Sequence, residues 1–299
     1  MTFNTILSQI PIYKFKVTMI SNSPVKLHSW NNSTIRGALG TKLIQKFCTN
    51  NPVMTCESCS KSLQCSACIL YHTGTPNDSS QNINPYIVSC EDYIDDQELI
   101  FSLTVFANGV NTMNDIFSIL KEGLTIGKSL TMFKLKSIED YYTNQPIFDG
   151  YMWCAINPHY IEYTQKEYSH LTIKFITPYH IKANANSINF EYILRSALRR
   201  VTALCKQSNI PIDLDYKLLL DDAKNIKTID KNIRLKSYSR YSNRTHQSMN
   251  IMGYIGSISF EGNLTQYIPI FKLCEYINIG KLCVMNFGQI YCSWTTPAS

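Results

Sequence analysis

Apolar residues along this chain follow two patterns, one with strand periodicity and one with helical periodicity. Alternation with period two indicates strands, whereas apolar residues three or four positions apart indicate helices. In the first half, the pattern predicts a strand, a helix, a strand, a helix and a strand at residues 10–20, 31–47, 99–106, 113–120 and 130–138. Gly37 and Gly40 lower the helix propensity of the first helix, which indicates close packing or approach to a ligand there.

The second half repeats this order. The pattern predicts a strand, a helix, a long hairpin, a helix and a strand at residues 171–181, 190–204, 234–260, 265–277 and 282–294. With one further strand in the irregular segment 48–96, each half has the order β-α-β-β-α-β. We therefore expect an α+β protein of two tandem ferredoxin-like (RRM-like) domains at 1–150 and 151–299. The first domain would carry a cysteine-rich insertion at 48–96, and the repeated order suggests an internal duplication.

Cations occupy alternate positions along the first strand of the predicted hairpin. Because alternate side chains of a strand point to one face, the following residues are expected to share one: Arg234, Lys236, Tyr238, Arg240, Ser242, Arg244 and His246. The β-branched stretch 251–260 is expected to pack as the buried partner strand. Such a face suits an anionic ligand, but it equally suits a solvated basic edge strand that resists aggregation.

Charge is unevenly distributed along the chain. The net charge is +6, and residues 195–244 contain twelve Lys or Arg against five Asp. Residues 49–98 contain one Lys against seven acidic residues. A phosphate-rich partner is therefore expected to bind the C-terminal half and to be repelled by the cysteine-rich segment.

Composition excludes several classes of protein. A hydrophobic content of 44% and a charged content of 17% exclude a disordered chain. No apolar run approaches the roughly 20 residues that span a bilayer, and no secretion signal is recognisable, so we expect a cytoplasmic protein without a membrane partner. The sequence lacks G-x-S-x-G, Walker and H-E-x-x-H motifs, which removes the common serine-hydrolase, P-loop and zinc-protease interpretations.

The eleven cysteines fall into a cluster and a scattered set. The cluster holds two C-x-x-C pairs, formed by Cys56, Cys59, Cys65 and Cys68. Four thiolates satisfy a closed tetrahedral zinc site, so we expect a structural zinc here, with Cys48 or His72 as substitute ligands. An iron–sulfur cluster and reduced loop cysteines are the alternatives. Scattered single thiols elsewhere fit a reducing cytoplasm.

Other candidate residues are basic side chains and histidines. Arg195 and Arg199 lie four positions apart on the predicted helix, beside Arg200, where they could reach an anion or form a solvated face. A histidine of near-neutral pKa can deprotonate a hydroxyl, and nearby cations can stabilise a phosphorane. His28 stands between the first strand and the first helix, and His246 ends the basic strand.

Several short motifs occur in order along nearly the whole chain. They are Arg36–Gly40, Cys68–Tyr71, Gly123 with Gly127–Lys128, Thr177–Lys182, Arg199–Arg200, Arg240–Arg244 with Gly253, Gly256 and Gly262, and Pro269 with Gly280–Lys281 and Gly288. In this order they resemble the CRISPR-associated repeat endoribonucleases, the Cas-six family of the RAMP superfamily. The match of Arg240–Arg244 with the glycines that follow is the most specific.

The resemblance implies a reaction and its residues. A 2′-hydroxyl of precursor CRISPR RNA would attack the adjacent phosphate within the repeat, without metal, leaving a 2′,3′-cyclic phosphate and a 5′-hydroxyl. His28 matches the position of the family's general base, and His246 is the second candidate. Expected partners are repeat RNA or crRNA and other CRISPR effector subunits. The expected RNA-binding residues are Arg36, Arg195, Arg199, Arg200, Lys236, Tyr238, Arg240, Tyr241, Arg244 and Lys281.

The chain departs from the family pattern in its last loop. The family is glycine-rich there, whereas this chain reads Met285–Gln289 with only Gly288. Asn tolerates positive φ better than most residues, so Asn286 is expected to replace a glycine. Some relatives bind the repeat or the guide without cutting it, which makes a non-catalytic guide-RNA-binding subunit the main alternative. A zinc-bearing interaction module is the third.

Overall fold

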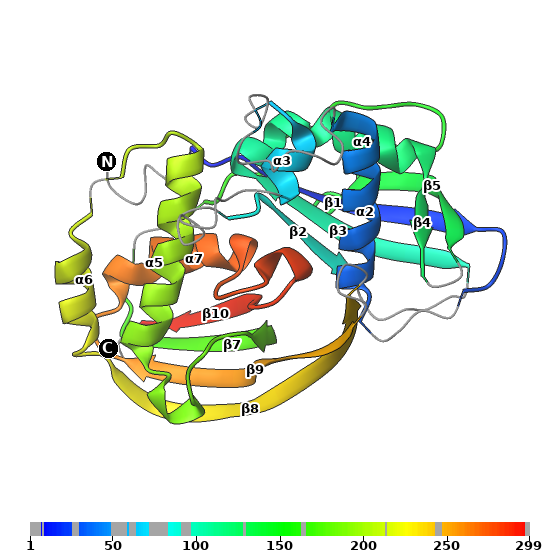
Figure 1. Cartoon of the computed structure of the whole chain (residues 1–299). Coiled ribbons are helices and arrows are strands. Elements are labelled where there is room, and N and C mark those ends of the chain that lie inside the picture. Colours follow the sequence, from blue (N-terminus) through cyan, green and yellow to red (C-terminus); the bar gives the residue numbers. More distant parts are fainter. Residues whose placement is uncertain are drawn as a thin grey trace. The chain divides into compact units, whose positions relative to one another are not determined.

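The computed structural model describes residues 7, 9–25, 30–48, 59, 64–71, 83–90, 97–127, 130–162, 166–212, 214–242 and 247–296. The chain divides into two compact units (Figure 1). One comprises Pro11–His159, and the other comprises Met1–Ile10 together with Tyr160–Ser299. No helix among the described residues is both long and apolar enough to cross a membrane.

The first unit is built on an antiparallel sheet. Its elements are β1 (Ile12–Ser21), α2 (Asn32–Phe47), α3 (Ser66–Tyr71), β2 (Tyr86–Cys90), β3 (Glu98–Phe106), α4 (Met113–Glu122), β4 (Leu124–Ile126), β5 (Thr131–Asp140) and β6 (Pro146–Phe148). The strand order is β2-β3-β1-β5-β4, and β6 pairs with β5. Strand β2 is the additional strand expected within 48–96, so the ferredoxin-like order is confirmed. Element α3 is a short helix that the hydrophobic pattern did not predict.

The core of the first unit lies between this sheet and helices α2 and α4. Phe15 of β1 packs edge-on against Phe117 of α4, with ring centroids 5.2 Å apart. The predicted stripe of α2 is buried through Ile35, Leu39 and Leu43. Burying such side chains contributes about 1.5–3 kcal/mol each, which is why the amphipathic pattern located these helices correctly.

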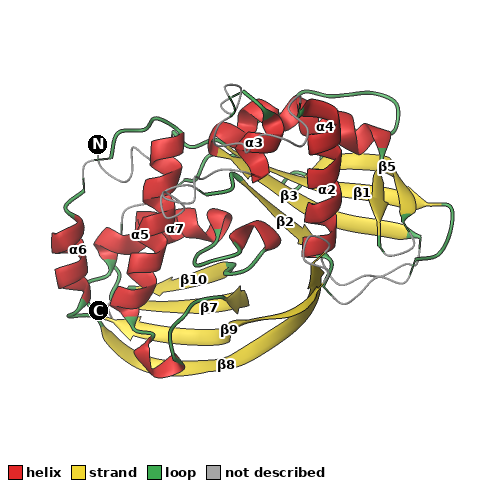
Figure 2. Ribbon diagram, viewed as in Figure 1, coloured by secondary structure: helices red, strands yellow, loops and turns green. Residues whose placement is uncertain are grey.

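The second unit has the same topology. Its main elements are β7 (His170–Tyr179), α5 (Phe190–Gln207), α6 (Tyr216–Ala223), β8 (Lys227–Ser242), β9 (Gln247–Glu261), α7 (Ile268–Ile277) and β10 (Ile290–Thr295). The strand order β10-β7-β9-β8 is antiparallel throughout, with α5 and α7 on one face (Figure 2). The prediction of two tandem ferredoxin-like units is thus confirmed.

An aromatic cluster joins the two helices to the sheet in this unit. Phe190 begins α5 and lies within 6 Å, ring centroid to ring centroid, of Phe260, Tyr267 and Phe271. Asn189 caps α5 by accepting a hydrogen bond from the backbone amide of Tyr192. This cluster fixes α5 and α7 against β9, and β9 in turn carries β8.

Two boundaries in this unit differ from the sequence prediction. The hairpin begins at Lys227 rather than at residue 234, and the last strand begins at Ile290 rather than at residue 282. Residues before Ile290 form a loop because Leu282 and Asn286 both adopt left-handed backbone conformations. Strand geometry requires negative φ, so apolar composition alone overestimated this strand. Helix α6 was not predicted.

Candidate nucleic-acid interface

Strand β8 extends beyond the rest of its sheet. Strand β9 pairs with β8 from Glu261 down to Gln247, but it pairs with β7 only as far as Tyr254. Within the described residues, 236–242 and 247–253 of the hairpin therefore form a two-stranded ribbon. The position of this ribbon is set by the pairing at its base.

Two cations of β8 are exposed at the base of this ribbon. Arg234 and Lys236 are both exposed, and neither forms an ion pair with any side chain in the described part of the chain. The Lys236 ammonium lies 4.9 Å from the centroid of the Tyr238 ring. Tyr238 meets Phe287 edge-on at 6.3 Å, and Ile251, the cross-strand neighbour of Tyr238, is buried. The predicted alternation of side chains along β8 is therefore present. The contact of Tyr238 with Phe287 holds this cationic edge in position.

The remaining predicted residues of the hairpin lie at its end. Arg240 pairs with Met249 and Tyr241 with Ser248 in the strand register. The side chains of Arg240 and Tyr241 are outside what the structure describes, and Arg244 and His246 lie outside the described residues. Their RNA-binding and catalytic roles stay predictions.

Two glycines of β9 allow its neighbouring strands to approach closely, β7 at Gly253 and β8 at Gly256. A Cβ at Gly253 would lie 2.8 Å from Pro178 Cβ and 2.9 Å from the Tyr179 backbone. Gly256 has a φ of +119°, and a Cβ there would overlap the carbonyl oxygen of Asn232. The sequence motif that includes these glycines therefore has a steric reason, since only glycine fits between the strands.

The loop before β10 is ordered by asparagines. Asn286 has a φ of +59°, which confirms that it occupies a conformation for which glycine is common. Its Oδ1 accepts a hydrogen bond from Asn278 Nδ2 at 3.0 Å, and its Nδ2 donates to Gln289 Oε1 at 3.2 Å. Gly288 also has positive φ, and a Cβ there would overlap the Ile279 carbonyl. Lys281 is exposed at the start of this loop.

The three arginines of α5 have different environments. Arg195 is exposed and pairs with Glu191 at 2.6 Å, and Arg199 is exposed one turn later. Arg200 is only 8% exposed, and its Nη2 donates to the Ile277 carbonyl of α7 at 2.6 Å. The prediction that Arg200 binds RNA is therefore corrected: it faces the helix–helix contact, where it satisfies the C-terminal carbonyl of α7.

Arg36 belongs to a buried cluster in the first unit. Its guanidinium lies 4.7 Å from the centroid of the Tyr71 ring, and the Tyr71 hydroxyl donates to the Arg36 carbonyl. Burial raises the pKa of the neighbouring Tyr86 to about 12, so both phenols stay protonated at neutral pH. The ring of Tyr71 also fills the space that a Cβ at Gly40 would need. This explains Gly40 by packing, whereas a Cβ at Gly37 would meet nothing within 4 Å.

The cysteine cluster is only partly described. Cys59 and Cys65 are half-buried and Cys68 is buried in α3, while Cys56 and His72 lie outside the described residues. Within the described part of the chain, no group of three or more Cys, His, Asp or Glu could hold a metal ion. The three described members of the predicted zinc site are therefore not grouped as ligands.

The histidines that the structure describes are His159, His170 and His180. His28, the candidate general base, lies outside the described residues, as does His246. The ring of His170 is 3.9 Å from Glu261, and Nδ1 of His180 lies within hydrogen-bonding distance of the Met252 carbonyl at 2.5 Å. The assignment of His28 or His246 stays a prediction.

Sequence reasoning missed a pair of side chains on the open face of this sheet. Lys174 of β7 is directly opposite Tyr291 of β10 in the register, and both are exposed, Tyr291 by 57%. Open ferredoxin-like sheets can bind bases through exposed aromatic residues. The sequence signal that could have identified Tyr291 is a tyrosine at a solvent-facing position of a strand in which every second residue is buried.

Two family models match this chain, one in each half. Residues 173–290 match the model of the CRISPR-associated endoribonuclease Cas6, and residues 10–158 match AF_1859_N, described as an N-terminal domain. A search of curated proteins finds no match.

Solved structures with this fold cover nearly the whole chain. A Cas6 product complex has a TM-score of 0.61 and 11% identity, covering 94% of this chain and 100% of that one. Cas6 from Thermus thermophilus has a TM-score of 0.55 and 11% identity, covering 95% and 99%. A partial Cas6-RT-Cas1–Cas2 complex has a TM-score of 0.55 and 8% identity, covering 98% of this chain and 47% of that one. Residues 173–290 thus match the Cas6 family of CRISPR-associated endoribonucleases, and nearly the whole chain shares the fold of solved Cas6 structures.

Proposed function

We propose that this protein cuts precursor CRISPR RNA within its repeats, without metal, by attack of a 2′-hydroxyl on the adjacent phosphate. The products would be a 2′,3′-cyclic phosphate and a 5′-hydroxyl. The match to the Cas6 family supports the substrate class and the reaction type. The metal-independent route rests on the family resemblance, and no described residue bears on it directly.

The observation that carries the proposal is the exposed cationic edge of β8. Arg234 and Lys236 have no acidic partner among the described side chains, and they lie within the segment that matches the Cas6 family. Unpaired cations on a strand can bind successive phosphates, because a phosphate contact releases condensed counterions. A solvated edge strand without a ligand would expose the same two side chains. Measurements of RNA binding distinguish a phosphate-binding strand from a solvated edge strand.

Each residue has a defined role in the proposed reaction. His28 would accept the proton of the 2′-hydroxyl, and His246 is the second candidate for that step. Arg36, Arg195, Arg199, Lys236, Arg240, Arg244 and Lys281 would bind phosphates, and the ring of Tyr238 or Tyr241 would stack on bases. Arg200 is left out of this set because it is buried.

Cleavage of labelled repeat RNA in EDTA tests the proposal. We expect cleavage with a cyclic-phosphate terminus, loss of cleavage when the nucleotide upstream of the cut is 2′-deoxy, and loss of cleavage but not of binding in His28→Ala. Retained cleavage in His28→Ala would move the general base to His246 or elsewhere. Tight binding of repeat or guide RNA without turnover would instead support a non-catalytic guide-binding subunit of a CRISPR effector.

A structural zinc on Cys56, Cys59, Cys65 and Cys68 remains a separate proposal. The described cysteines are not grouped as ligands, so the site would require Cys56 and rearrangement of its neighbours. Elemental analysis of the purified protein should find one zinc per chain, and this zinc should be lost in a variant with Ser at all four positions. A zinc-free protein with full RNA affinity would remove the metal from the proposal.

A further inference from the structure

Four side chains gather where β1 begins and β5 ends in the first unit. They are Lys14, Tyr141, Tyr142 and His159, here called the Tyr142 cluster. The rings of Tyr142 and His159 are stacked, with centroids 4.5 Å apart and an interplanar angle of 26°. Tyr141 meets Tyr142 edge-on at 5.6 Å, and the Lys14 ammonium lies 3.5 Å from the Tyr141 centroid. Nothing in the sequence motifs of the family led to these residues.

Backbone hydrogen bonds hold the members of the cluster in place. The amide of Tyr141 donates to the Lys14 carbonyl at 2.9 Å, and Ile12 and His159 exchange two backbone hydrogen bonds of 3.0 and 2.8 Å. All of these atoms belong to the first unit, Pro11–His159. The rings are therefore positioned before any ligand arrives, which reduces the entropy lost on binding.

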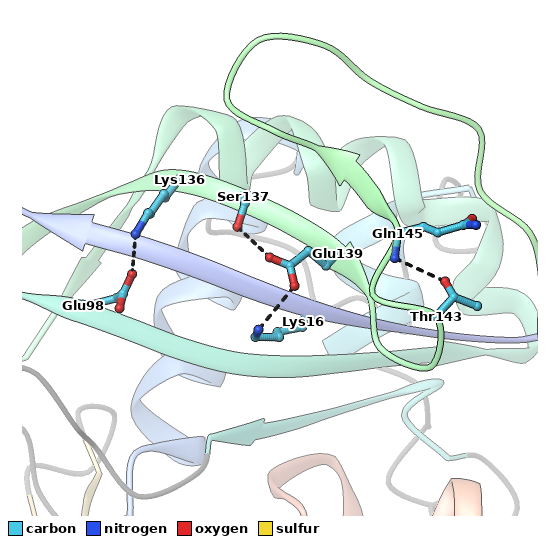
Figure 3. A network of polar contacts seen from close by, with 7 residues as sticks. All are labelled: Lys16, Glu98, Lys136, Ser137, Glu139, Thr143 and Gln145. Atoms are coloured by element: carbon cyan, nitrogen blue, oxygen red, sulfur yellow. Dashed lines mark hydrogen bonds and ion pairs between the residues drawn. The ribbon is translucent and has the colours of Figure 1, made fainter.

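The turn that carries both tyrosines is also fixed. One carboxylate oxygen of Asp140 accepts hydrogen bonds from the amides of Tyr142 and Thr143 and from the Thr143 hydroxyl, at 3.0, 2.8 and 3.0 Å. Thr143 Oγ1 in turn accepts from the amide of Gln145, as Figure 3 shows. These three hydrogen bonds fix the conformation of the turn.

The cluster is partly exposed and combines planar rings with a cation. Tyr141 is 37% exposed and Tyr142 is 38% exposed. A stacked ring pair can extend its stack by one more planar ring, and a neighbouring ammonium can bind the phosphate attached to that ring. Bases of single-stranded RNA meet both requirements, because they have π faces and phosphates about one nucleotide apart.

We propose that the Tyr142 cluster is a subsite that stacks one unpaired base of the bound RNA on Tyr142, with Lys14 near its phosphate. This subsite rests on the proposed function, because it assumes that the ligand of the protein is RNA. It lies in the first unit, whereas the cationic edge of β8 lies in the second. The first unit would thereby contribute a base contact and the second unit phosphate contacts.

A double-mutant cycle tests the subsite. Affinity of Tyr142→Ala, Tyr142→Phe and wild-type protein is measured by anisotropy with repeat RNA, and again with RNAs that carry an abasic nucleotide at each unpaired position in turn. Tyr142→Ala should weaken binding about 5- to 100-fold, as expected for one stacked base, while Tyr142→Phe binds like wild type. At one abasic position, the effect of Tyr142→Ala should disappear.

Tyr151→Ala is the matched control, because Tyr151 is 92% exposed and makes no ring contact with the four described residues of the cluster. Equal affinity of wild type and Tyr142→Ala, or an equal loss with every abasic RNA, would overturn the subsite. If wild type binds no repeat RNA, the proposed function fails, and an unstructured oligoadenylate replaces it as the probe. Loss of oligoadenylate binding in Tyr142→Ala would then support the subsite, and no loss would overturn it.

Discussion

Cations on the two sheets of this protein differ in whether an acidic side chain lies beside them. On the sheet of the first unit, Lys16 pairs with Glu139 at 3.3 Å and Lys136 with Glu98 at 2.8 Å (Figure 3). In the second unit, Arg234 and Lys236 of β8 are exposed and have no acidic partner among the described side chains. Equal numbers of cations thus create different surface potentials, because neighbouring acids cancel one set and leave the other.

The position of a cation relative to acidic side chains, and not the number of lysines, determines which cations stay unpaired. Hairpin geometry keeps Arg234 and Lys236 away from acids, whereas cross-strand register places Lys16 directly beside Glu139 in the first sheet. Exposed ion pairs of that kind stabilise a fold by about 0–1 kcal/mol and attract little RNA.

The largest expected effect concerns the glycines that position the cationic hairpin. Gly256→Ala should destabilise the protein by about 3 kcal/mol or more, because Gly256 has positive φ and a Cβ would overlap the Asn232 carbonyl. Chemical denaturation measures this loss. Gly37→Ala is the matched control in the first unit and should raise stability by about 1 kcal/mol through helix propensity.

Gly37→Ala also tests whether a ligand approaches Gly37. The side-chain space at Gly37 is open, so packing does not require glycine there. A stabilised variant with weakened RNA binding would show that a ligand backbone approaches this turn of α2. Unchanged binding would show that Gly37 has no such role.

Two neighbouring arginines should separate stability from binding. Arg200→Ala should lower the free energy of unfolding by about 2 kcal/mol, because Arg200 donates a buried hydrogen bond to the Ile277 carbonyl. Arg199→Ala should leave stability unchanged and weaken RNA binding several-fold, because Arg199 is exposed. Thermal melts and anisotropy check both. If Arg200→Ala weakened RNA binding with no effect on stability, its assigned structural role would be wrong.

Removing the unpaired cations should act through phosphate contacts. Arg234→Ala with Lys236→Ala should weaken repeat-RNA binding roughly 10-fold at moderate salt and lower the slope of log affinity against log salt by about 1.5. The measurement is a salt titration of binding. Lys16→Ala with Lys136→Ala, which removes the paired lysines of the first sheet, should change affinity less than about threefold.

A loss in the Lys16 and Lys136 variant as large as in the β8 variant would show that ion pairs do not mask the first sheet. That outcome would contradict the expected difference between paired and unpaired cations. The proposal of an RNA-binding face on β8 would then rest on the family match alone.

Parts of the fold follow directly from the sequence. The buried stripe of α2 and the helix at Phe190 follow from apolar spacing, because a helix face must be buried to be stable. The αL conformation of Asn286 was expected from its side chain and from the missing glycine. Helices α3 and α6 were not found, because short helices carry too few apolar positions to show a periodicity.

The candidate site could be predicted only in part. The charge excess and alternation located β8, because both are local properties of sequence. Arg200 was misplaced because the helical pattern could not show that α7 packs against its flank. The Tyr142 cluster joins residues about 130 positions apart in the chain, so no local pattern could reveal it.

Periodicity and motif order are encoded locally, so the sequence is sufficient to predict the class of protein, the βαββαβ order of both halves and the resemblance to the Cas6 family. Which cations stay unpaired depends on tertiary contacts. Whether a lysine meets an acid depends on strand register, as between Lys16 and Glu139, and whether an arginine is exposed depends on helix packing, as for Arg200. Both are relations between segments distant in the chain, and the proposed RNA-binding surface depends on them.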